Sequence, residues 1–573
     1  MLKRTLLYLL LFSSFMVAQA QTKTTNYYQK VFYNDTSIIT FKSVVSNPDG
    51  SHVILGDYQN ATNNGDLVLM KTDTLGNVVW STVIGNDSTE AGQSLARTPD
   101  GGYVFSSDIT DPRDFLNVKM EVGKVDSLGN LKWGSIFGGK EGNQSNGISV
   151  LGNGKIIVAG KGTKDGDAFS SGYSLTLDQN GTPDNGLFYK RGNFQDFISS
   201  AQQTSDGGVA LGGSTWSYLT SPSYFDPMLI KLNTKGDTVW TKRYTMPNTQ
   251  FAYLMRVTRQ NDFLLGGQLA VSDTYRGTFL LKANSNGQFK WCKGYTAFPN
   301  LDKYFQRIYD IAPIKDGYVA AGIIRDGTTD SIKIKSFYSG LDTIIIGART
   351  KGFMMKTDTA GNVLWSRVYA DTVSANYLGS RTTEFSSIIP TFDGGFTLVG
   401  TTFSYGAKRG GGILIHVDKD GYMGSANSCN ITNPLTWSIR NFDSVDSSGT
   451  NIVESGDENT LKLRKSTLPF KKNDLCNAKG TYIPTTGLKD ELLPESAVKI
   501  YPNPTRDELF IEFLRSNNAQ TKVTIFDLTG RIIHTEKSNS EVLRINTPQF
   551  ARGIYFVRVE QEGRFLTKKI VVQ

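Results

Sequence analysis

Short runs of alternating apolar and polar residues fill most of this chain, and tight-turn signals separate them. One run, DLVLMKTD at Asp66–Asp73, leads through a turn into NVVWSTVIG at Asn77–Gly85. A period of two residues is typical of β-strands that bury one face, and an Asp or Asn followed by Gly suits a tight hairpin. The pattern therefore predicts an all-β chain of short antiparallel strands.

The same turn returns along the chain as a marker that ends in tryptophan. Five copies are clear: Asp73–Trp80, Asp126–Trp133, Asn233–Trp240, Asn284–Trp291 and Asp358–Trp365. Two weaker copies begin at Asp178 and Asp418, which makes seven. The spacing is roughly 50 residues, in the range of solenoids and propellers.

A second hairpin marker divides each repeat into four strands. It reads PDGG at Pro99–Gly102, and related turns begin at Thr204, Ile314 and Thr391. Seven four-stranded units predict a seven-bladed β-propeller, with an order of features that loosely resembles kelch repeats. We expect the tryptophans to pack between blades, and the repeated Asp to serve the turn, because no calcium-loop spacing accompanies it. One strand position is also periodic, and we expect it to be solvated or hydrogen-bonded: Lys71, Lys124, Lys231, Lys282, Lys356 and His416.

The ends of the repeat array predict how the ring closes. The seventh repeat lacks a fourth strand after ILIHVDKDG at Ile413–Gly421, while NYYQKVFYND at Asn26–Asp35 has the character of one. Pairing Tyr27–Asn34 with Gly412–Asp418 would close the ring and remove two exposed sheet edges. The alternative, an open array of hairpins, would leave both edges bare.

Charge, cysteine content and the amino terminus narrow the function classes. Residues 1–20 carry a basic start, an apolar run and small residues, which predict a cleaved secretory signal. No later run is long and apolar enough for a membrane span. The formal net charge is +8 with scattered Lys and Arg, which does not favour nucleic-acid binding. The three cysteines leave a possible Cys429–Cys476 disulfide and a buried free thiol at Cys292, and we expect no metal or cofactor.

The last part of the chain changes pattern and predicts a separate Ig-like β-sandwich of six or seven short strands. Its distinguishing pieces follow one another in order: Tyr501, Pro502, Asn503 and Pro504, then Asp527 and Gly530, then Gly553 and Tyr555, and finally Gly563. Together these pieces resemble the C-terminal type A sorting domain of type IX secretion cargo from Bacteroidota. The resemblance covers only about the last 80 residues. It implies the type IX machinery as a partner, passage through the periplasm and delivery to the cell surface or medium.

These features predict four parts: a signal peptide at 1–20, a propeller at 21–429, an extension or linker at 430–494 and a sorting domain at 495–573. The extension is rich in Ser, Thr and Asn.

Loops between second and third strands should share one face of the propeller with the blade-to-blade connections. Two of these loops stand out, the long segment 325–351 and the aromatic segment 214–227.

The aromatic loop carries the main functional hypothesis, a binding or adhesion module for an extracellular glycan or protein. Its candidate ligand-binding residues are Trp216, Tyr218, Tyr224 and Phe225. A carbohydrate hydrolase or lyase is the alternative, with candidate carboxylates near the starts of innermost strands: Glu90, Asp196 and Glu384. A purely structural surface component is a third reading, and the pattern favours a protein that is not an enzyme.

Overall fold

The computed structural model describes residues 23–34, 36–59, 65–111, 114–138, 142–164, 167–189, 195–216, 225–246, 249–270, 276–296, 305–335, 342–369, 382–403, 407, 410–423, 438–442, 445–448, 458–459, 464–466, 471–482, 498–513, 521–527, 532–561 and 564–573. It divides into two compact units, Met1–Ile483 and Pro484–Gln573. The predicted signal peptide at 1–20 lies outside the described residues. Among the described residues, no helix has the length and apolar character needed to cross a membrane.

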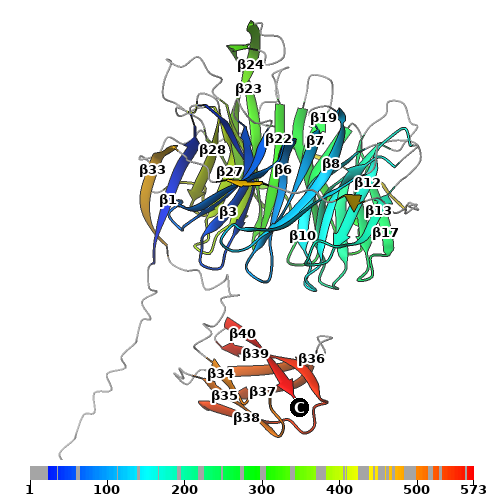
Figure 1. Cartoon of the computed structure of the whole chain (residues 1–573), viewed down its shortest axis with the longest axis vertical. Helices are drawn as coiled ribbons and strands as arrows, with labels where there is room; N and C mark the ends of the chain where they lie inside the picture. The colour runs from blue at the N-terminus through cyan, green and yellow to red at the C-terminus, as the bar shows by residue number, and fades with distance from the viewer. Residues whose placement is uncertain are drawn as a thin grey trace, which may run out of the picture. The chain divides into compact units, whose positions relative to one another are not determined.

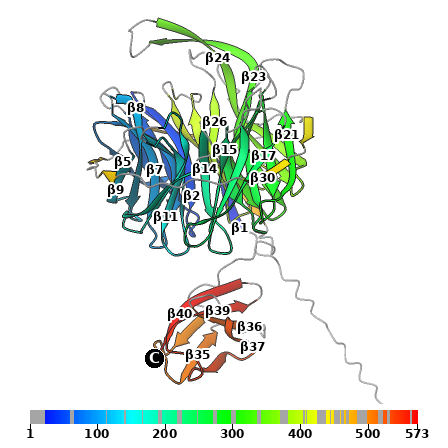
Figure 2. The same ribbon diagram turned by 90° about the vertical axis from the view of Figure 1, so that its right-hand side faces the viewer.

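The first unit is a seven-bladed β-propeller, as the repeats predicted. Its sheets stand side by side in both views of the ribbon (Figure 1, Figure 2). Blade 1 contains β2 (Ile38–Ser46), β3 (His52–Gln59), β4 (Asp66–Thr72) and β5 (Val78–Gly85). Blade 2 contains β6 (Thr89–Arg97), β7 (Tyr103–Asp111), β8 (Asp114–Val125) and β9 (Leu131–Phe137). Blade 3 contains β10 (Asn143–Val150), β11 (Ile156–Gly162), β12 (Ser171–Leu177) and β13 (Pro183–Tyr189). Blade 4 contains β14 (Asp196–Gln203), β15 (Val209–Thr215), β16 (Asp226–Leu232) and β17 (Thr238–Thr245).

The remaining blades follow the same antiparallel order. Blade 5 contains β18 (Thr249–Val257), β19 (Phe263–Ala270), β20 (Arg276–Ala283) and β21 (Phe289–Thr296). Blade 6 contains β22 (Phe305–Ile314), β23 (Gly317–Lys335), β24 (Asp342–Asp358) and β25 (Val363–Tyr369). Blade 7 contains β26 (Thr383–Pro390), β27 (Phe396–Thr402), β28 (Gly411–Val417) and, from the other end of the chain, β1 (Lys23–Tyr33).

Ring closure by the amino-terminal strand is confirmed. β1 pairs antiparallel with β28, with Tyr28 opposite His416 and Phe32 opposite Gly412. Blade 7 also contacts blade 1, because the Ser386 hydroxyl donates to the carbonyl of Phe41 at 2.7 Å. The first and last repeats therefore share one continuous wall.

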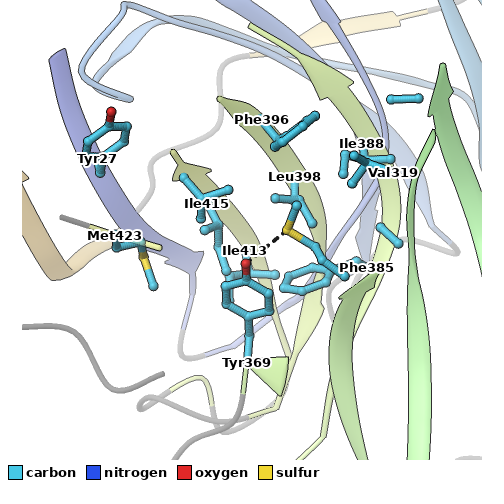
Figure 3. Packing of buried hydrophobic residues seen from close by; sticks show 14 of the residues in the cluster. Tyr27, Val319, Tyr369, Phe385, Ile388, Phe396, Leu398, Ile413, Ile415 and Met423 are labelled. Atoms are coloured by element: carbon cyan, nitrogen blue, oxygen red, sulfur yellow. Dashed lines mark hydrogen bonds between the residues drawn. The ribbon is translucent and has the colours of Figure 1, made fainter. Parts of the chain in front are cut away.

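The core of the propeller is divided among the joints between blades. Each joint between neighbouring blades holds its own cluster of buried apolar side chains. Figure 3 shows the cluster between blades 6 and 7, where Tyr369 and Phe385 pack with rings 5.3 Å apart. Because the strands alternate, both faces of a blade are buried against its neighbours. The apolar core therefore lies between the blades, and these clusters do not fill the centre of the ring.

The repeated tryptophans pack between blades, as predicted. Each lies against the glycine in the turn marker of the next blade: Trp80 on Gly129, Trp133 on Gly181, Trp240 on Gly287, Trp291 on Gly361 and Trp365 on Gly421. A Cβ at any of these glycines would come within about 3 Å of the indole ring, so only glycine allows this approach. At the seam, Tyr28 of β1 takes the tryptophan's place against Gly76.

Four of the five repeated lysines form ion pairs with an acid in the turn between the first two strands of their own blade. The N···O distances are 2.7 Å for Lys124–Asp100, 2.9 Å for Lys231–Asp206, 3.1 Å for Lys282–Asp262 and 3.0 Å for Lys356–Asp316. In blade 7 the pair is His416–Asp393 at 2.9 Å. The periodic position therefore ties the third strand to the hairpin between the first two.

The extension predicted at 430–494 adds single strands to the outer edges of blades. Its strands are β29 (Ser438–Phe442), β30 (Val445–Ser448), β31 (Glu458–Asn459), β32 (Arg464–Ser466) and β33 (Lys471–Tyr482). They pair in turn with β21, β17, β9, β5 and β1. We call residues 438–482 the belt, because the chain passes from blade 5 through blades 4, 2 and 1 to blade 7.

The cysteines are described only in part. Cys429 and the side chain of Cys476 lie outside the described residues, so their disulfide stays a prediction. Cys292 is a buried free thiol, and burial raises its pKa.

The long segment of blade 6 is a strand extension where a loop was expected. β23 and β24 stay paired from Arg325–Thr350 outward to Lys335–Asp342 and form a hairpin that rises beyond the other blades (Figure 2). Alternating residues such as SIKIK explain why the ladder continues.

The second unit is a β-sandwich of two sheets. One sheet has β34 (Val498–Tyr501), β35 (Glu508–Phe513) and β38 (Val542–Asn546). The other has β36 (Thr521–Asp527), β37 (Ile532–Ser538), β39 (Gly553–Gln561) and β40 (Arg564–Val572). Side chains from both sheets form one buried core that includes Leu509, Val523 and Val557.

Candidate functional site

Every innermost strand of the propeller carries a β-bulge at the same position. The bulged residues are Lys42, Gln93, Asn146, Ser199, Tyr253, Tyr309 and Ser386, one from each blade. A bulge inserts one unpaired residue and redirects its side chain, and bulges are frequent beside functional sites. We call this ring of residues the waist.

Two cavities meet at the waist. The upper cavity, of about 630 Å³, opens toward the face that carries the blade-to-blade connections. The lower cavity, of about 880 Å³, continues toward the hairpin turns of the opposite face. The residues that line both cavities are the seven waist residues. The upper cavity has a volume typical of small-molecule sites.

One side of the upper cavity is aromatic and belongs to blades 4, 5 and 6. Phe197, Phe225, Phe251, Tyr253 and Tyr309 line it. Phe225 and Phe251 have ring centroids 4.5 Å apart, and Phe251 stacks on Tyr253 at 6.1 Å with 12° between the planes. These rings form a nearly continuous apolar surface.

Arg307 on β22 orients two of these rings. Its guanidinium lies 4.6 Å from the ring centroid of Tyr253 and 5.5 Å from that of Tyr309. It also donates to Gln268 Oε1 at 3.2 Å, and the Tyr253 hydroxyl donates to the same oxygen at 3.3 Å. Cation–π contact and shared hydrogen bonds therefore hold the aromatic surface in place.

The other side of the cavity is polar. It is formed by Lys42, Gln93, Gln144, Asn146, Lys161, Gln195 and Glu384. Gln93 Nε2 donates to Asp108 Oδ2 at 3.3 Å, and Asn146 Nδ2 donates to the carbonyl of Ile198 at 2.8 Å. Lys42 Nζ lies 3.7 Å from Asp57 Oδ2. Neighbouring groups therefore orient these polar side chains before any ligand arrives.

Glu384 in this polar side and Asp108, which accepts a hydrogen bond from Gln93 of the lining, have shifted pKa values. Burial raises the pKa of Glu384, and the nearby Lys42 and Arg307 oppose that shift. Burial also raises the pKa of Asp108 to about 7, against hydrogen bonds from Ser145. Glu384 is thus a half-buried carboxyl group between two cations and an aromatic wall.

The three carboxylates proposed from the sequence are not brought together. Glu384 lines the upper cavity, whereas Glu90 and Asp196 are 2% and 1% exposed and do not line it. Both of these residues lie three positions before the waist residue of their strand, and Glu384 lies two before. Since alternate residues face opposite sides, Glu90 and Asp196 point into the wall. Burial raises the pKa of Glu90 to about 9, so it carries a proton at neutral pH.

The aromatic residues proposed from the sequence divide into two groups. Tyr218 and Tyr224 lie outside the described residues. Trp216 and Phe225 stack on each other with centroids 5.5 Å apart and 23° between planes. Phe225 lines the upper cavity, whereas Trp216 is not among the residues that line it.

Sequence reasoning missed the waist and the aromatic residues of the innermost strands. A signal was present in some of these strands, where the alternation of apolar and polar residues breaks at a corresponding place, as in FKS around Lys42, FAY before Leu254 and IYD around Tyr309. Aligning the repeats on that break would have shown aromatic residues in consecutive blades. Among the described residues, no group of three or more His, Cys, Asp or Glu side chains could hold a metal ion.

Comparison with known proteins concerns mainly the second unit. Residues 499–573 match the family model of the secretion system C-terminal sorting domain. This part of the chain is a type IX secretion sorting domain. It directs the protein to the outer cell surface or the medium.

The predicted motif residues of the sorting domain occupy strand ends and turns. Asn503 Nδ2 donates to the carbonyl of Lys569, and its Oδ1 accepts from the amide of Val571, both at 2.9 Å. Tyr501 ends β34, Asp527 ends β36, Gly553 begins β39 and the Tyr555 hydroxyl donates to the carbonyl of Ala551 at 2.7 Å. Pro502 and Pro504 flank Asn503, and Gly530 and Gly563 lie outside the described residues.

Similarity to solved structures is weak. The GDP-Man-dependent mannosyltransferase MPT-1 from Leishmania mexicana has 12% identity and a TM-score of 0.21, over 45% of this chain and 83% of that one. The extracellular domain of BT4673 from B. thetaiotaomicron has 9% identity and a TM-score of 0.15, over 93% and 92%. Neither likeness supports an inference about this chain. None of the curated proteins matches it.

Proposed function

We propose that this protein is an exported glycan-binding module whose ligand occupies the upper cavity of the propeller. The observation that carries the proposal is the division of the cavity into an aromatic side and a polar side. A sugar ring has an apolar C–H face and a rim of hydroxyl groups. Aromatic rings stack against the C–H face, and amide, ammonium and carboxylate groups form hydrogen bonds with the hydroxyl groups.

Binding without turnover is the proposed mode. Paired carboxyl groups on either side of the scissile bond are the usual apparatus of glycoside hydrolysis. Among the described residues that line the upper cavity, Glu384 is the single carboxylate. We therefore assign Glu384 to hydrogen bonding with ligand hydroxyls.

Loss of one stacking ring should weaken saccharide binding. We expect Phe251→Ala to lower affinity roughly tenfold, because a ring that stacks on the ligand is removed. The probes are neutral gluco-, manno-, xylo- and chito-oligosaccharides of graded length, measured by titration calorimetry on the full chain. Gln144→Ala should weaken the same ligands from the polar side.

Phe392→Ala is the matched control. Phe392 is 66% exposed in the hairpin turn after β26 and does not line the cavity, so its loss should leave affinity unchanged. Equal thermal midpoints would show that all variants fold. The proposal is overturned if Phe251→Ala binds every saccharide as well as the parent, or if no saccharide binds while proteins or peptides do.

A further inference from the structure

The upper cavity is encircled at its floor. Each of the seven blades contributes a waist residue to its lining, and these residues are shared with the lower cavity. At this depth the ring of blades leaves no side through which a polymer could run across the site. Only the end of a chain that enters from the outer face can therefore reach the waist.

The waist forms the floor of the upper cavity and its boundary with the lower cavity. The waist carries five long side chains, Lys42, Gln93, Asn146, Tyr253 and Tyr309, and two serines. The aromatic residues of the lining lie at this level or on the outer side of it. Beyond it, the described lining of the lower cavity has no further aromatic residue and consists of aliphatic residues, small polar residues and cations such as Arg97 and Arg259. Recognition of an apolar sugar face therefore stops at the waist.

We propose that the upper cavity binds the terminus of a glycan chain, with the end sugar against the waist and the chain leaving through the outer mouth. This inference rests on the proposed glycan function. The hydroxyls of the end sugar face the ammonium and amide groups of Lys42, Gln93 and Asn146. The sugars that follow stack on the surface formed by Phe197, Phe225 and Phe251, which lies on the outer side of the waist.

The test is the number of protein molecules bound per glycan chain. Whichever of the gluco-, manno-, xylo- or chito-oligosaccharides binds is compared with size fractions of its own polymer, by calorimetry and analytical ultracentrifugation. End binding predicts a fixed number of proteins per chain at every chain length, and an affinity that stops rising after a few sugars. A number of bound proteins that grows in proportion to chain length overturns end binding and leaves glycan binding intact.

A second measurement uses ligands without free ends. For a glucan ligand, maltohexaose is compared with α-cyclodextrin, its six-unit cyclic counterpart; for other ligands, both termini of the oligosaccharide are chemically capped. We expect the cyclic or capped ligand to bind at least tenfold more weakly than the ligand with free ends. Equal binding of the endless ligand contradicts the proposal, and the absence of binding by any saccharide removes both this inference and the function on which it rests.

Discussion

Glu121 on β8 shows how the wall of the propeller tolerates a buried carboxyl group. It is fully buried, the hydroxyl of Ser107 donates to it, and burial raises its pKa to about 7 from an ordinary value of 4.5. Glu90 is buried nearby, and neither of its oxygens has a hydrogen-bond partner among the described residues. At this scale the protein buries carboxyl groups inside its wall, where burial favours their protonated form, and leaves Glu384 at the cavity.

Glu121→Gln should therefore change the pH dependence of stability. Between pH 4.5 and 7 the unfolded chain loses its proton at this position while the folded chain keeps it, so stability falls as the pH rises. The free energy of unfolding of the variant, relative to that of the parent, should rise by up to about 3 kcal/mol between pH 4.5 and 7. Denaturant titration at pH 4.5 and pH 8 measures the gain.

The exposed, partly paired Asp184 provides the control for this measurement. Its side chain is 48% exposed, so solvent screening should keep the effect of Asp184→Asn on the free energy of unfolding small. An unchanged difference for Glu121→Gln would mean that the folded protein ionises Glu121 as readily as the unfolded chain does.

Among the elements, β1 is the strand that closes the ring. It pairs with β28 on one side and with β33 on the other, so residues from both ends of the first unit meet at one seam. Tyr28 is fully buried there, stacks on His416 with ring centroids 5.5 Å apart, and packs on Gly76 as tryptophans do in other blades. The seam therefore uses the same joint as the rest of the ring.

Two substitutions of Tyr28 should separate the contribution of its ring to stability from that of its hydroxyl group. Tyr28→Ala should cost about 3 kcal/mol of unfolding free energy, because a large buried ring is lost. Tyr28→Phe should be neutral or stabilising, since the hydroxyl is buried without a hydrogen-bond partner among the described residues. Chemical denaturation gives both values, and a Phe variant as unstable as the Ala variant would show that the hydroxyl is needed.

The whole molecule consists of a propeller that carries its own belt and a sorting domain with a separate core. The belt adds a fifth strand to the outer edges of blades 1, 2, 4, 5 and 7. Added strands pair backbone groups that a bare edge would expose. The segment before the sorting domain is therefore part of the propeller fold.

Two truncations should distinguish the belt from the sorting domain. A chain that ends after Ile483 should keep the thermal midpoint of the propeller and remain in the periplasm, because its core is complete and its export signal is gone. A chain that ends after Met423 should unfold at a clearly lower temperature and lose amide protection along β1. Equal midpoints for the two truncations would contradict a stabilising belt, and surface delivery of either one would contradict the export route.

Local chemistry allowed the sequence alone to determine much of this protein. Period-two strands and Asp/Asn–Gly turns depend on neighbouring residues, so the hairpins, the seven blades and the closing strand Tyr27–Asn34 could all be predicted. The sorting domain was also evident, because its motif pieces occur in a fixed order.

Tertiary structure alone decided which side chains meet in the cavity. One bulged residue in each innermost strand, as at Tyr253, sets which residues on either side of it face the centre, and neighbours in the cavity come from repeats about 50 residues apart. A shift of one position sends Glu90 into the wall and leaves Glu384 facing the cavity. The path of the belt was likewise hidden, because strand partners far apart in sequence leave no mark on the local pattern that forms each strand.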